Sequence, residues 1–599
     1  PGRTRRRSRS RSRRSRGRRS RSRRSRGRRS RSRRQRRSRS KSTRNKGNAP
    51  ALSHSALDES VARAQAAAEK MKAAEPEAPS IAVDWTKVER QPFRRQFLDP
   101  YQQALTRPED AAAIRAHFSI DIESDPGGVG LTPAPIRSFS ELGALPDWIR
   151  QALAENRWDT PMPIQSQALP ILLSGRNLVG IAQTGSGKTG AFLVPAIVHA
   201  NDQRPLWRND PGPIVLVLSP TRELAVQISD EADKLTYSSR SHAHPDGIRS
   251  VCFYGGGRKY EQLKKFTFDG SHIVVATPGR LMDFCREGKV TLQRVTYLCL
   301  DEADRMLDMG FRGDMEQIGA AIRPERQTVF FSATWPKEVQ ALTSELCMDA
   351  PITIRVRKPG SSAAGENGED PQALLASESI TQEVVVIDFP GEDKPWAKQD
   401  DEKRRRLEAH IKSALQDPEA KMLVFVNQKG FADELSNKLW EEGVHVDAIH
   451  GGKPQETRLW VLDKFRKGET RLLIATDVIG RGLDIPKVSH VVVYSINGIE
   501  DYVHRIGRTG RGKDGRGHAL VFFEYSGTQP DTARELIGLL QRSKQPVPEE
   551  LHKIAEEMAS GKRWARNDSS WGGQSSWSSG GGSSGWRGVG WNGGGGNGG

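Results

Sequence analysis

The stretch NLVGIAQTGSGKT, residues 177–189, runs from an apolar segment into a glycine-rich loop. The apolar segment is typical of a buried strand, and the residues that follow the loop favour a helix. Glycines in AQTGSGKT (182–189) let backbone N–H groups turn toward phosphate oxygens, and the helix adds the positive end of its dipole. Lys188 would reach the β- and γ-phosphates, and the Thr189 hydroxyl would bind Mg²⁺. The segment therefore predicts a nucleotide-binding α/β domain whose contacts come from Thr184, Gly185, Ser186, Gly187, Lys188 and Thr189.

A second apolar run ends in two carboxylates. TYLCLDE, residues 296–302, places Asp301 and Glu302 at the end of a predicted strand. An acidic residue at the carboxyl end of a buried strand suits metal binding beside a phosphate loop. We expect Asp301 to hold Mg²⁺, through water, and Glu302 to orient and deprotonate the attacking water. A solvated acidic loop is the common alternative, but the pairing with a phosphate loop favours an ATPase.

Apolar runs of this kind recur along two parts of the chain and alternate with helical stretches. Such alternation predicts βαβ units and buried parallel sheets. We expect one α/β domain over 136–355, a linker over 356–379, and a second α/β domain over 380–545. The strands of the first are predicted at 177–183, 213–219, 273–278, 296–302 and 328–334. Those of the second are predicted at 421–427, 444–450, 471–477, 490–495 and 518–523.

The remaining segments have biased compositions. Residues 1–46 carry 26 Lys and Arg and no Asp or Glu, so the formal net charge of +20 leaves 20 − 26 = −6 for the rest. We interpret 1–50 as a disordered Arg/Ser-rich arm that binds polyanions weakly. Residues 51–135 form a partly helical flank, with an Ala-rich helix over 51–75 and an extended part lying on the core. Residues 546–599 form a Gly/Ser/Trp-rich tail with one short helix (EELHKIAEEMA), and its tryptophans could stack on unpaired bases or simply belong to a solubilising tail.

Cysteine spacing and hydropathy exclude several classes of protein. No two of the four cysteines form a CxxC pair, so the cysteines indicate neither a zinc site nor a disulfide framework, and buried thiols are expected. No apolar run approaches about 18 residues, so we expect no membrane segment. The Arg/Ser-rich start lacks the apolar region of a secretory signal.

The acidic pair is part of Asp301-Glu302-Ala303-Asp304, which spells the name of the DEAD-box helicase family, and about ten motifs of that family appear in order over 139–525. The chain therefore resembles a DEAD-box protein, which implies two tandem RecA-like domains. The resemblance implies that Gln165 hydrogen-bonds adenine and that Phe139 stacks on it. Where the family usually has Gly, Phe and Thr, this chain has Arg157, Trp158 and Met162.

Further roles carry over from the family motif by motif. Contacts to the RNA backbone are implied for Thr221, Arg222, Gly256, Thr277, Gly279 and Arg280 in the first domain, and for Gln455, Arg458 and Thr476 in the second. Such groups grip sugar and phosphate without reading bases. The resemblance also implies a ribose contact from Asp484 and arginine fingers from Arg508 and Arg511. Coupling of ATP to RNA is implied for Ser332, Thr334 and His504. Ile479 and Gly480 replace alanines that are common in the family.

These expectations describe an RNA-dependent ATPase and helicase that uses ATP and Mg²⁺ and closes two domains on RNA. The Arg/Ser arm resembles those of splicing factors, so we expect a nuclear protein that binds spliceosomal or messenger-ribonucleoprotein partners. Shuttling to the cytoplasm is left open. We also expect a monomer. One alternative is an ATP-dependent RNA clamp that recruits partners with little unwinding. Another is a DNA-directed helicase or nuclease subunit, which the motif set disfavours because its groove resembles one that senses 2′-hydroxyls.

Overall fold

The computed structural model describes residues 81–99, 106–128, 130–183, 185–206, 212–240, 244–357, 379–389, 395–477, 485, 487–510, 516–525 and 529–562. The predictions for the arm at 1–50, the helix at 51–75, and most of the linker and tail lie outside these residues. Those for Thr184, Asp484 and Arg511 lie outside them as well.

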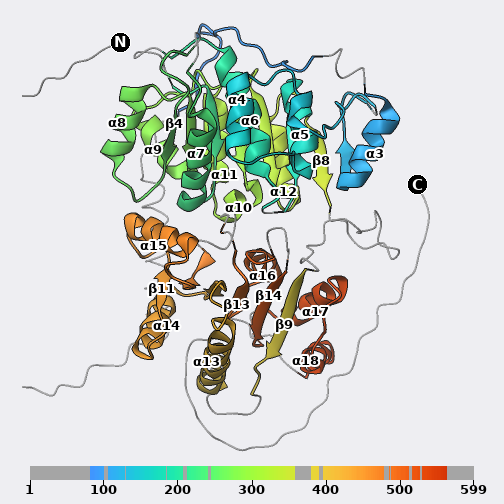
Figure 1. Cartoon of the computed structure of the whole chain (residues 1–599), viewed down its shortest axis with the longest axis vertical. Helices are drawn as coiled ribbons and strands as arrows, with labels where there is room; N and C mark the ends of the chain where they lie inside the picture. The colour runs from blue at the N-terminus through green and yellow to red at the C-terminus, as the bar shows by residue number, and fades with distance from the viewer. Residues whose placement is uncertain are drawn as a thin grey trace, which may run out of the picture. The chain divides into compact units, whose positions relative to one another are not determined.

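The first domain is built on an eight-stranded sheet of order β1-β8-β2-β7-β6-β3-β5-β4. Figure 1 labels β4 and β8 of this sheet. All neighbours are parallel except β1, which runs antiparallel to β8 at the edge. The strands are β1 (Ile120–Ser124), β2 (Leu178–Ile181), β3 (Val215–Leu218), β4 (Ser250–Phe253), β5 (Ile273–Ala276), β6 (Tyr297–Asp301), β7 (Gln327–Ser332) and β8 (Ile352–Val356).

Helices cover both faces of this sheet because its strands are apolar on both sides. In β3, Val215 and Val217 join one buried cluster, whereas Leu216 and Leu218 join the other. Helices α4 (Asp147–Glu155), α5 (Pro163–Leu173), α6 (Lys188–Asp202) and α7 (Arg222–Thr236) supply the first cluster. Helices α9 (Pro278–Arg286), α10 (Ala303–Asp308), α11 (Arg312–Ala321) and α12 (Lys337–Leu346) supply the second. The other elements are α3 (Pro108–Phe118), the 3₁₀ turn η1 (Phe139–Glu141) and α8 (Lys259–Asp269).

The second domain has a six-stranded parallel sheet of order β11-β12-β10-β13-β14-β9. Its strands are β9 (Ile380–Val386), β10 (Met422–Phe425), β11 (Val446–Ile449), β12 (Leu472–Ala475), β13 (His490–Val493) and β14 (Gly517–Phe523). One face packs on α13 (Pro395–Ala414) and α14 (Lys429–Glu441). The other packs on α15 (Gln455–Lys467), α16 (Ile499–Ile506), α17 (Thr532–Arg542) and α18 (Glu549–Ala559). The prediction of two tandem domains with parallel sheets is confirmed.

The ten predicted strands are all present, but four strands of the structure were not predicted. These are β1, β4, β8 and β9. Their sequences mix polar and apolar residues, as in IDIES of β1, because three of them lie at sheet edges and β8 is next to one. The first domain therefore begins before the predicted boundary at 136, since β1 pairs with β8. The second continues past 545, since α18 buries Leu551 and Ile554 in its core.

The segment 81–98 lies extended on the first domain, as predicted for the flank. The backbone N–H groups of Phe97 and Leu98 donate to the carbonyl of Leu173 at 2.6 and 2.9 Å. Arg94 forms an ion pair with Asp202 at 2.6 Å. These contacts attach the flank to the ends of α5 and α6.

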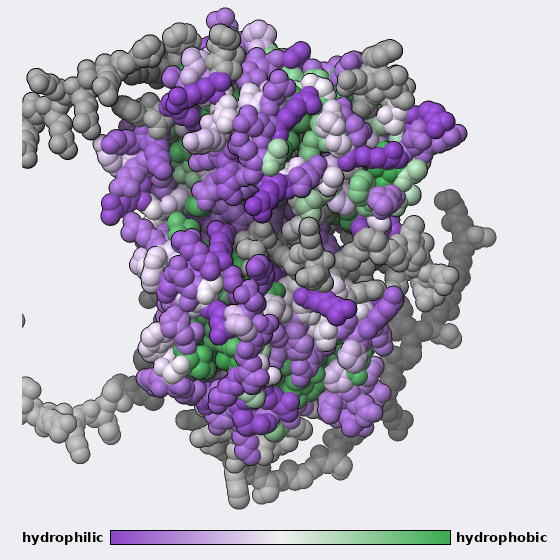
Figure 2. Space-filling view, viewed as in Figure 1, coloured by the Kyte–Doolittle hydropathy of each residue, from purple (hydrophilic) through white to green (hydrophobic). Residues whose placement is uncertain are grey.

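The exposed surface is polar, and the four cysteine side chains are buried or half-buried. The face of the molecule in Figure 2 is mostly hydrophilic, with hydrophobic residues showing in small patches. Cys299 and Cys347 are buried and Cys252 and Cys285 half-buried, and none of the four forms a disulfide. Within the described ranges, no helix combines the length and apolar character needed to span a membrane.

Candidate functional site

A pocket of about 440 Å³ opens where the predicted phosphate loop, the acidic pair and the segment around Gln165 meet. Its volume falls in the range of small-molecule sites. The described residues that line it all come from the first domain: Arg157, Trp158, Asp159, Thr160, Met162, Gln165, Gly185, Gly187, Lys188, Thr189, Gly190, Gln227, Glu231, Asp301 and Glu302. The structure thus brings together residues that lie more than a hundred positions apart in the sequence.

The phosphate loop has the local conformation that its glycines permit. Gly185 and Gly187 adopt positive φ values of 81° and 89°, which non-glycine residues rarely take. Gly187 caps α6, so the helix begins at Lys188 with its N-terminus directed at the pocket. The Lys188 ammonium is 7% exposed and donates to the Ala182 carbonyl at 3.1 Å. A buried cation next to free helix N–H groups makes a site for phosphate.

The acidic pair lies at the carboxyl end of β6, as predicted. Asp301 is the last residue of the strand, and Glu302 has φ 54°, a strained value that turns the chain sharply into α10. Both residues are 3% exposed, yet Oδ1 of Asp301 and Oε2 of Glu302 have no hydrogen-bond partner among the described residues. Burial raises the pKa of the Asp301 carboxyl to about 7, although the charge of Lys188 opposes the rise. Two buried oxygens without partners indicate a site built for a ligand.

The segment before α5 packs directly against the phosphate loop. Gln165 accepts the N–H of Met162 at 2.9 Å and donates from Nε2 to the Gly187 carbonyl at 3.0 Å. A Cβ atom at Gly190 would lie 2.5 Å from the Trp158 ring and 2.7 Å from Gln165 Nε2. Trp158 and Gln165 therefore form one wall of the pocket, in contact with the first turn of α6.

Phe139 occupies a different place from the one predicted for it. Its ring is 7% exposed and belongs to the core cluster under α4 and α5, outside the pocket lining. The 3₁₀ turn that carries it is closed by a capping box between Ser138 and Glu141. In this structure Trp158 is the aromatic side chain that faces the pocket, so adenine stacking by Phe139 is not supported by the geometry.

Ser332 and Thr334 connect the phosphate loop and the acidic motif. The Thr334 hydroxyl and N–H both donate to Oδ2 of Asp304, at 2.8 and 3.1 Å. The Ser332 carbonyl accepts the N–H of Ala182 at 3.1 Å. Thr334 thus joins this motif to the acidic motif. The Ser332 hydroxyl is buried without a partner.

The predicted RNA-backbone residues of the first domain gather at two helix starts and a glycine turn. Thr221 caps α7 by accepting the N–H of Leu224 at 3.3 Å, and Thr277 precedes α9. Arg280 donates to the Gly257 carbonyl at 3.3 Å. A side chain at Gly256 (φ 78°) would overlap the Arg222 guanidinium, and a Cβ at Gly279 would come no closer than 4.0 Å to its surroundings.

Gln455 and Arg458 of α15 do not present their side chains as predicted. Arg458 forms an ion pair with Glu223 at 2.5 Å, and Gln455 donates to the same oxygen at 2.9 Å. The three side chains are almost fully buried. Glu223, Gln455 and Arg458 are thus held against one another at the start of α7. Thr476, after β12, is half-buried and donates its N–H to Ile449 at 3.2 Å.

The second-domain arginine motif is buried around α16. Arg505 makes a bidentate pair with Asp477 at 2.8 Å and also donates to Asn427 and Ser495. Arg508 is 1% exposed and donates from Nε to the His504 carbonyl at 3.2 Å. His504 is 6% exposed. Arg508 therefore does not line the pocket in this structure.

Glu223 and Arg305 have clear structural roles that the sequence motifs did not assign to them. Glu223 receives both Gln455 and Arg458. Arg305 donates to the backbone carbonyl of Asp477 at 2.6 Å and so joins α10 to the second domain. A charged residue directly after a helix start or after an acidic motif is the signal that could have identified Glu223 and Arg305.

Comparisons with protein families agree with this geometry. The family model described as DEAD/DEAH box helicase matches residues 162–342, and the helicase conserved C-terminal domain matches 402–513. The ATP-dependent RNA helicase DBP2 of Candida albicans is 42% identical over 475 residues, which cover 79% of this chain and 77% of the relative. The DBP2 of Saccharomyces cerevisiae is 46% identical over 423 residues, 70% of each chain.

Solved structures of the same kind share the fold. S. cerevisiae Dbp5 bound to RNA and ADP BeF3 superposes with a TM-score of 0.54 at 26% identity, covering 71% of this chain and all of that one. Mss116p bound to single-stranded RNA and AMP-PNP gives 0.57 at 26% identity, covering 73% and 84%.

Proposed function

The chain belongs to the DEAD-box family of ATP-dependent RNA helicases, and we propose that it remodels RNA in the nucleus, in pre-mRNA splicing or another messenger-ribonucleoprotein step. The support is compositional: residues 1–46 are nearly all Arg, Ser and Gly and carry 26 basic residues without an acid. Such an arm holds RNA loosely and raises its concentration near the core. Phosphorylation of its serines would lower the arm's charge by about 2 per site.

The observation that carries the catalytic assignment is the pair of buried, unpartnered oxygens on Asp301 and Glu302 beside Lys188. Oxygen ligands of this kind fit Mg²⁺, and the charge of Lys188 fits a phosphate. We infer that Asp301 and the Thr189 hydroxyl hold the ion, which would neutralise charge on the phosphates. Glu302 takes the proton of the attacking water.

Hydrolysis also needs a group that the pocket lacks in this structure. Arg508 is one of the two residues that the family motif assigns to the γ-phosphate, and an arginine finger contributes about 10³–10⁵ in rate. Because Arg508 is buried against His504 and the pocket is lined by the first domain, we propose that it reaches the phosphate when the second domain rearranges on ATP and RNA.

Two contacts would carry the state of the pocket to the RNA-binding elements. Thr334 contacts the acidic motif through its hydrogen bond to Asp304. Arg305, the next residue in the chain, donates a hydrogen bond to the backbone carbonyl of Asp477. Asp477 in turn orients Arg505 on α16. Since ATP and RNA would each favour the same arrangement of these contacts, each should strengthen the binding of the other.

The first experiment measures ATP hydrolysis by the full chain with no nucleic acid, with single-stranded RNA and with DNA of the same sequence. Glu302→Gln keeps the shape of the side chain but removes the base. We expect turnover that RNA stimulates, that DNA does not, and that the variant abolishes while ATP still binds. Tight binding of ATP and RNA without turnover would support the clamp alternative, and equal stimulation by DNA would contradict RNA specificity.

A second experiment tests the nuclear proposal. The full chain and a chain without residues 1–50 are expressed as fluorescent fusions in a eukaryotic cell. We expect the full chain in the nucleus and cross-linked to pre-mRNA or small nuclear RNA, and the shortened chain depleted from both. Exclusion of the full chain from the nucleus would contradict the proposal while leaving the ATPase assignment intact.

A further inference from the structure

Three histidines of the second domain lie close together at the amino ends of its strands, which is the end of the sheet opposite the helicase motifs. His490 begins β13, His518 is the second residue of β14, and the two are directly paired across the parallel ladder. The third, His410, comes from α13. Thr476 and the other motif residues follow the carboxyl ends of the strands, whereas these histidines lie at the amino ends. The cluster is therefore separate from the ATP and RNA site.

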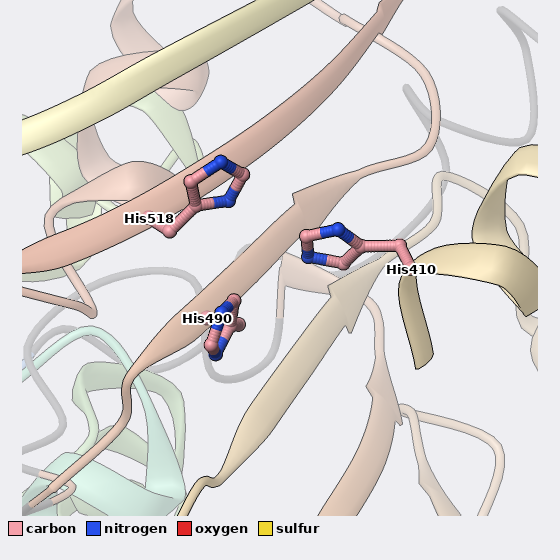
Figure 3. A group of neighbouring side chains, drawn as sticks. All are labelled: His410, His490 and His518. Atoms are coloured by element: carbon pink, nitrogen blue, oxygen red, sulfur yellow. The ribbon is translucent and has the colours of Figure 1, made fainter. Parts of the chain in front are cut away.

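Strand alternation explains why the rings meet. Val492 and Leu520 pack on the face covered by α13, and His490 and His518 lie two positions earlier in the same strands. Side chains two apart on a strand share a face, so both histidines face α13. Figure 3 shows the imidazole of His410 reaching from its helix toward the other two rings.

The separation of the rings is close to that of a metal site. One ring nitrogen from each histidine lies within 4.8 Å of those of the other two. The ring centroids are 5.1, 5.3 and 5.6 Å apart. With Zn–N bonds of about 2.0–2.1 Å, two nitrogens bound to one tetrahedral ion lie about 3.4 Å apart. The distance between any two of these ring nitrogens would therefore have to shorten by roughly 1.4 Å at most, through rotation of the side chains.

The hydrogen bonds of the three imidazoles leave ring nitrogens available to bind a metal ion. Nε2 of His410 and Nδ1 of His518 are buried and have no hydrogen-bond partner in the part of the chain that the structure describes. The outer nitrogen of His518 lies 3.3 Å from the Glu383 carboxylate, and Nδ1 of His490 is 2.9 Å from the Ser489 hydroxyl. Metal-binding histidines typically have their second nitrogen fixed by such groups. Each ring thus has a route to present one lone pair to a common centre.

We propose that His410, His490 and His518 bind one transition-metal ion, with Zn²⁺ the first candidate. Three imidazoles and an open fourth position for water suit Zn²⁺, and imidazole also suits Ni²⁺ and Cu²⁺. The neutral ring is the form of histidine that binds a metal ion. The side chain of His518 is 28% exposed, which leaves a path from solvent. The ion would cross-link α13 to β13 and β14 and so stabilise the second domain, without contacting the ATP pocket.

The test is Zn²⁺ binding to the full chain, first stripped with a chelator and then titrated against a chromogenic zinc indicator. We expect one site per chain that is lost, by about 100-fold or more in affinity, in His490→Asn and His518→Asn. Glu383→Gln, which keeps all three ligands, should weaken binding by about 10- to 100-fold. The matched control is His445→Asn, since His445 is an exposed histidine of the same domain whose ring lies against Trp440.

A second measurement needs no variant and therefore does not depend on the folding of one. Co²⁺ added to the stripped wild-type chain should give visible d–d absorption that Zn²⁺ then displaces. Saturating Zn²⁺ should also raise the unfolding temperature of the wild-type chain and of His445→Asn, but not of His490→Asn. Equal Zn²⁺ affinity in the wild-type chain and His490→Asn, or no site above that of the surface histidines, would overturn the proposal and leave the rings as a packed aromatic cluster.

Discussion

A methyl group added at Gly190 should selectively damage recognition of the base of ATP. Gly190 lies in the first turn of α6, two residues after Lys188, and its Cβ would lie 2.5 Å from Trp158 and 2.7 Å from Gln165. Ordinary contacts begin near 3.4 Å, so in Gly190→Ala the tryptophan ring must move by 0.9 Å and the glutamine amide by 0.7 Å. The phosphate loop itself keeps its glycines and its lysine.

The magnitude follows from the two contacts at risk. The hydrogen bond to adenine that the family resemblance implies for Gln165 would contribute about 1 kcal/mol, and contact of the base with the Trp158 ring would contribute about another 1 kcal/mol. Losing both would weaken ATP binding by about 2 kcal/mol, or about 30-fold. The helix should not suffer, since alanine is favoured over glycine in a helix by about 1 kcal/mol.

The assay compares dissociation constants for fluorescent ATP and GTP analogues. We expect Gly190→Ala to weaken ATP by about 30-fold but GTP far less, so that the preference for adenine is lost. The control is Gly313→Ala in α11, where a Cβ has open space and no effect is expected. Unchanged ATP affinity in Gly190→Ala would show that Trp158 and Gln165 move without cost and would refute the reasoning. An equal loss for ATP and GTP would mean that the loop, and not the base-reading wall, was disturbed.

Three other changes give distinct outcomes. Thr334→Ala removes the hydroxyl bond to Asp304, so RNA-stimulated unwinding should fall at least about 10-fold while ATP binding persists; equal loss of both would contradict a coupling role. Arg505→Lys cannot reproduce the bidentate pair with Asp477, so we expect a loss of about 3 kcal/mol in urea unfolding of the second domain. Burial lowers the pKa of His199 from 6.5 to about 3. Between these two pH values the unfolded chain binds a proton at His199 that the folded chain does not bind. Stability should therefore fall as the pH drops below about 6.5, by about 1.4 kcal/mol per pH unit from this residue, and His199→Gln should show a shallower acid slope in denaturation measured at pH 7 and pH 5.

The sequence was sufficient for the central strands of both sheets. A strand buried on both faces must be a continuous apolar run, as in residues 213–219, and such runs can be recognised without any knowledge of neighbours. Edge and near-edge strands such as β1 have no such requirement. Their sequences include polar residues, of which Glu123 in β1 is exposed, so only pairing with a neighbour identifies them as strands.

The candidate site divides in the same way. The phosphate loop, its lysine and the acidic pair are local arrangements, in which a strand end, a glycine turn or a helix start fixes the geometry within a few residues, and so their spacing alone determined them. The pairing of Glu223 with Arg458, the burial of Arg508 and the meeting of His410, His490 and His518 depend on which strands are neighbours and which helix covers which face. Contacts between residues so far apart in the chain leave no periodic signal in it, because they are set by packing of the whole sheet, and only the tertiary structure decided them.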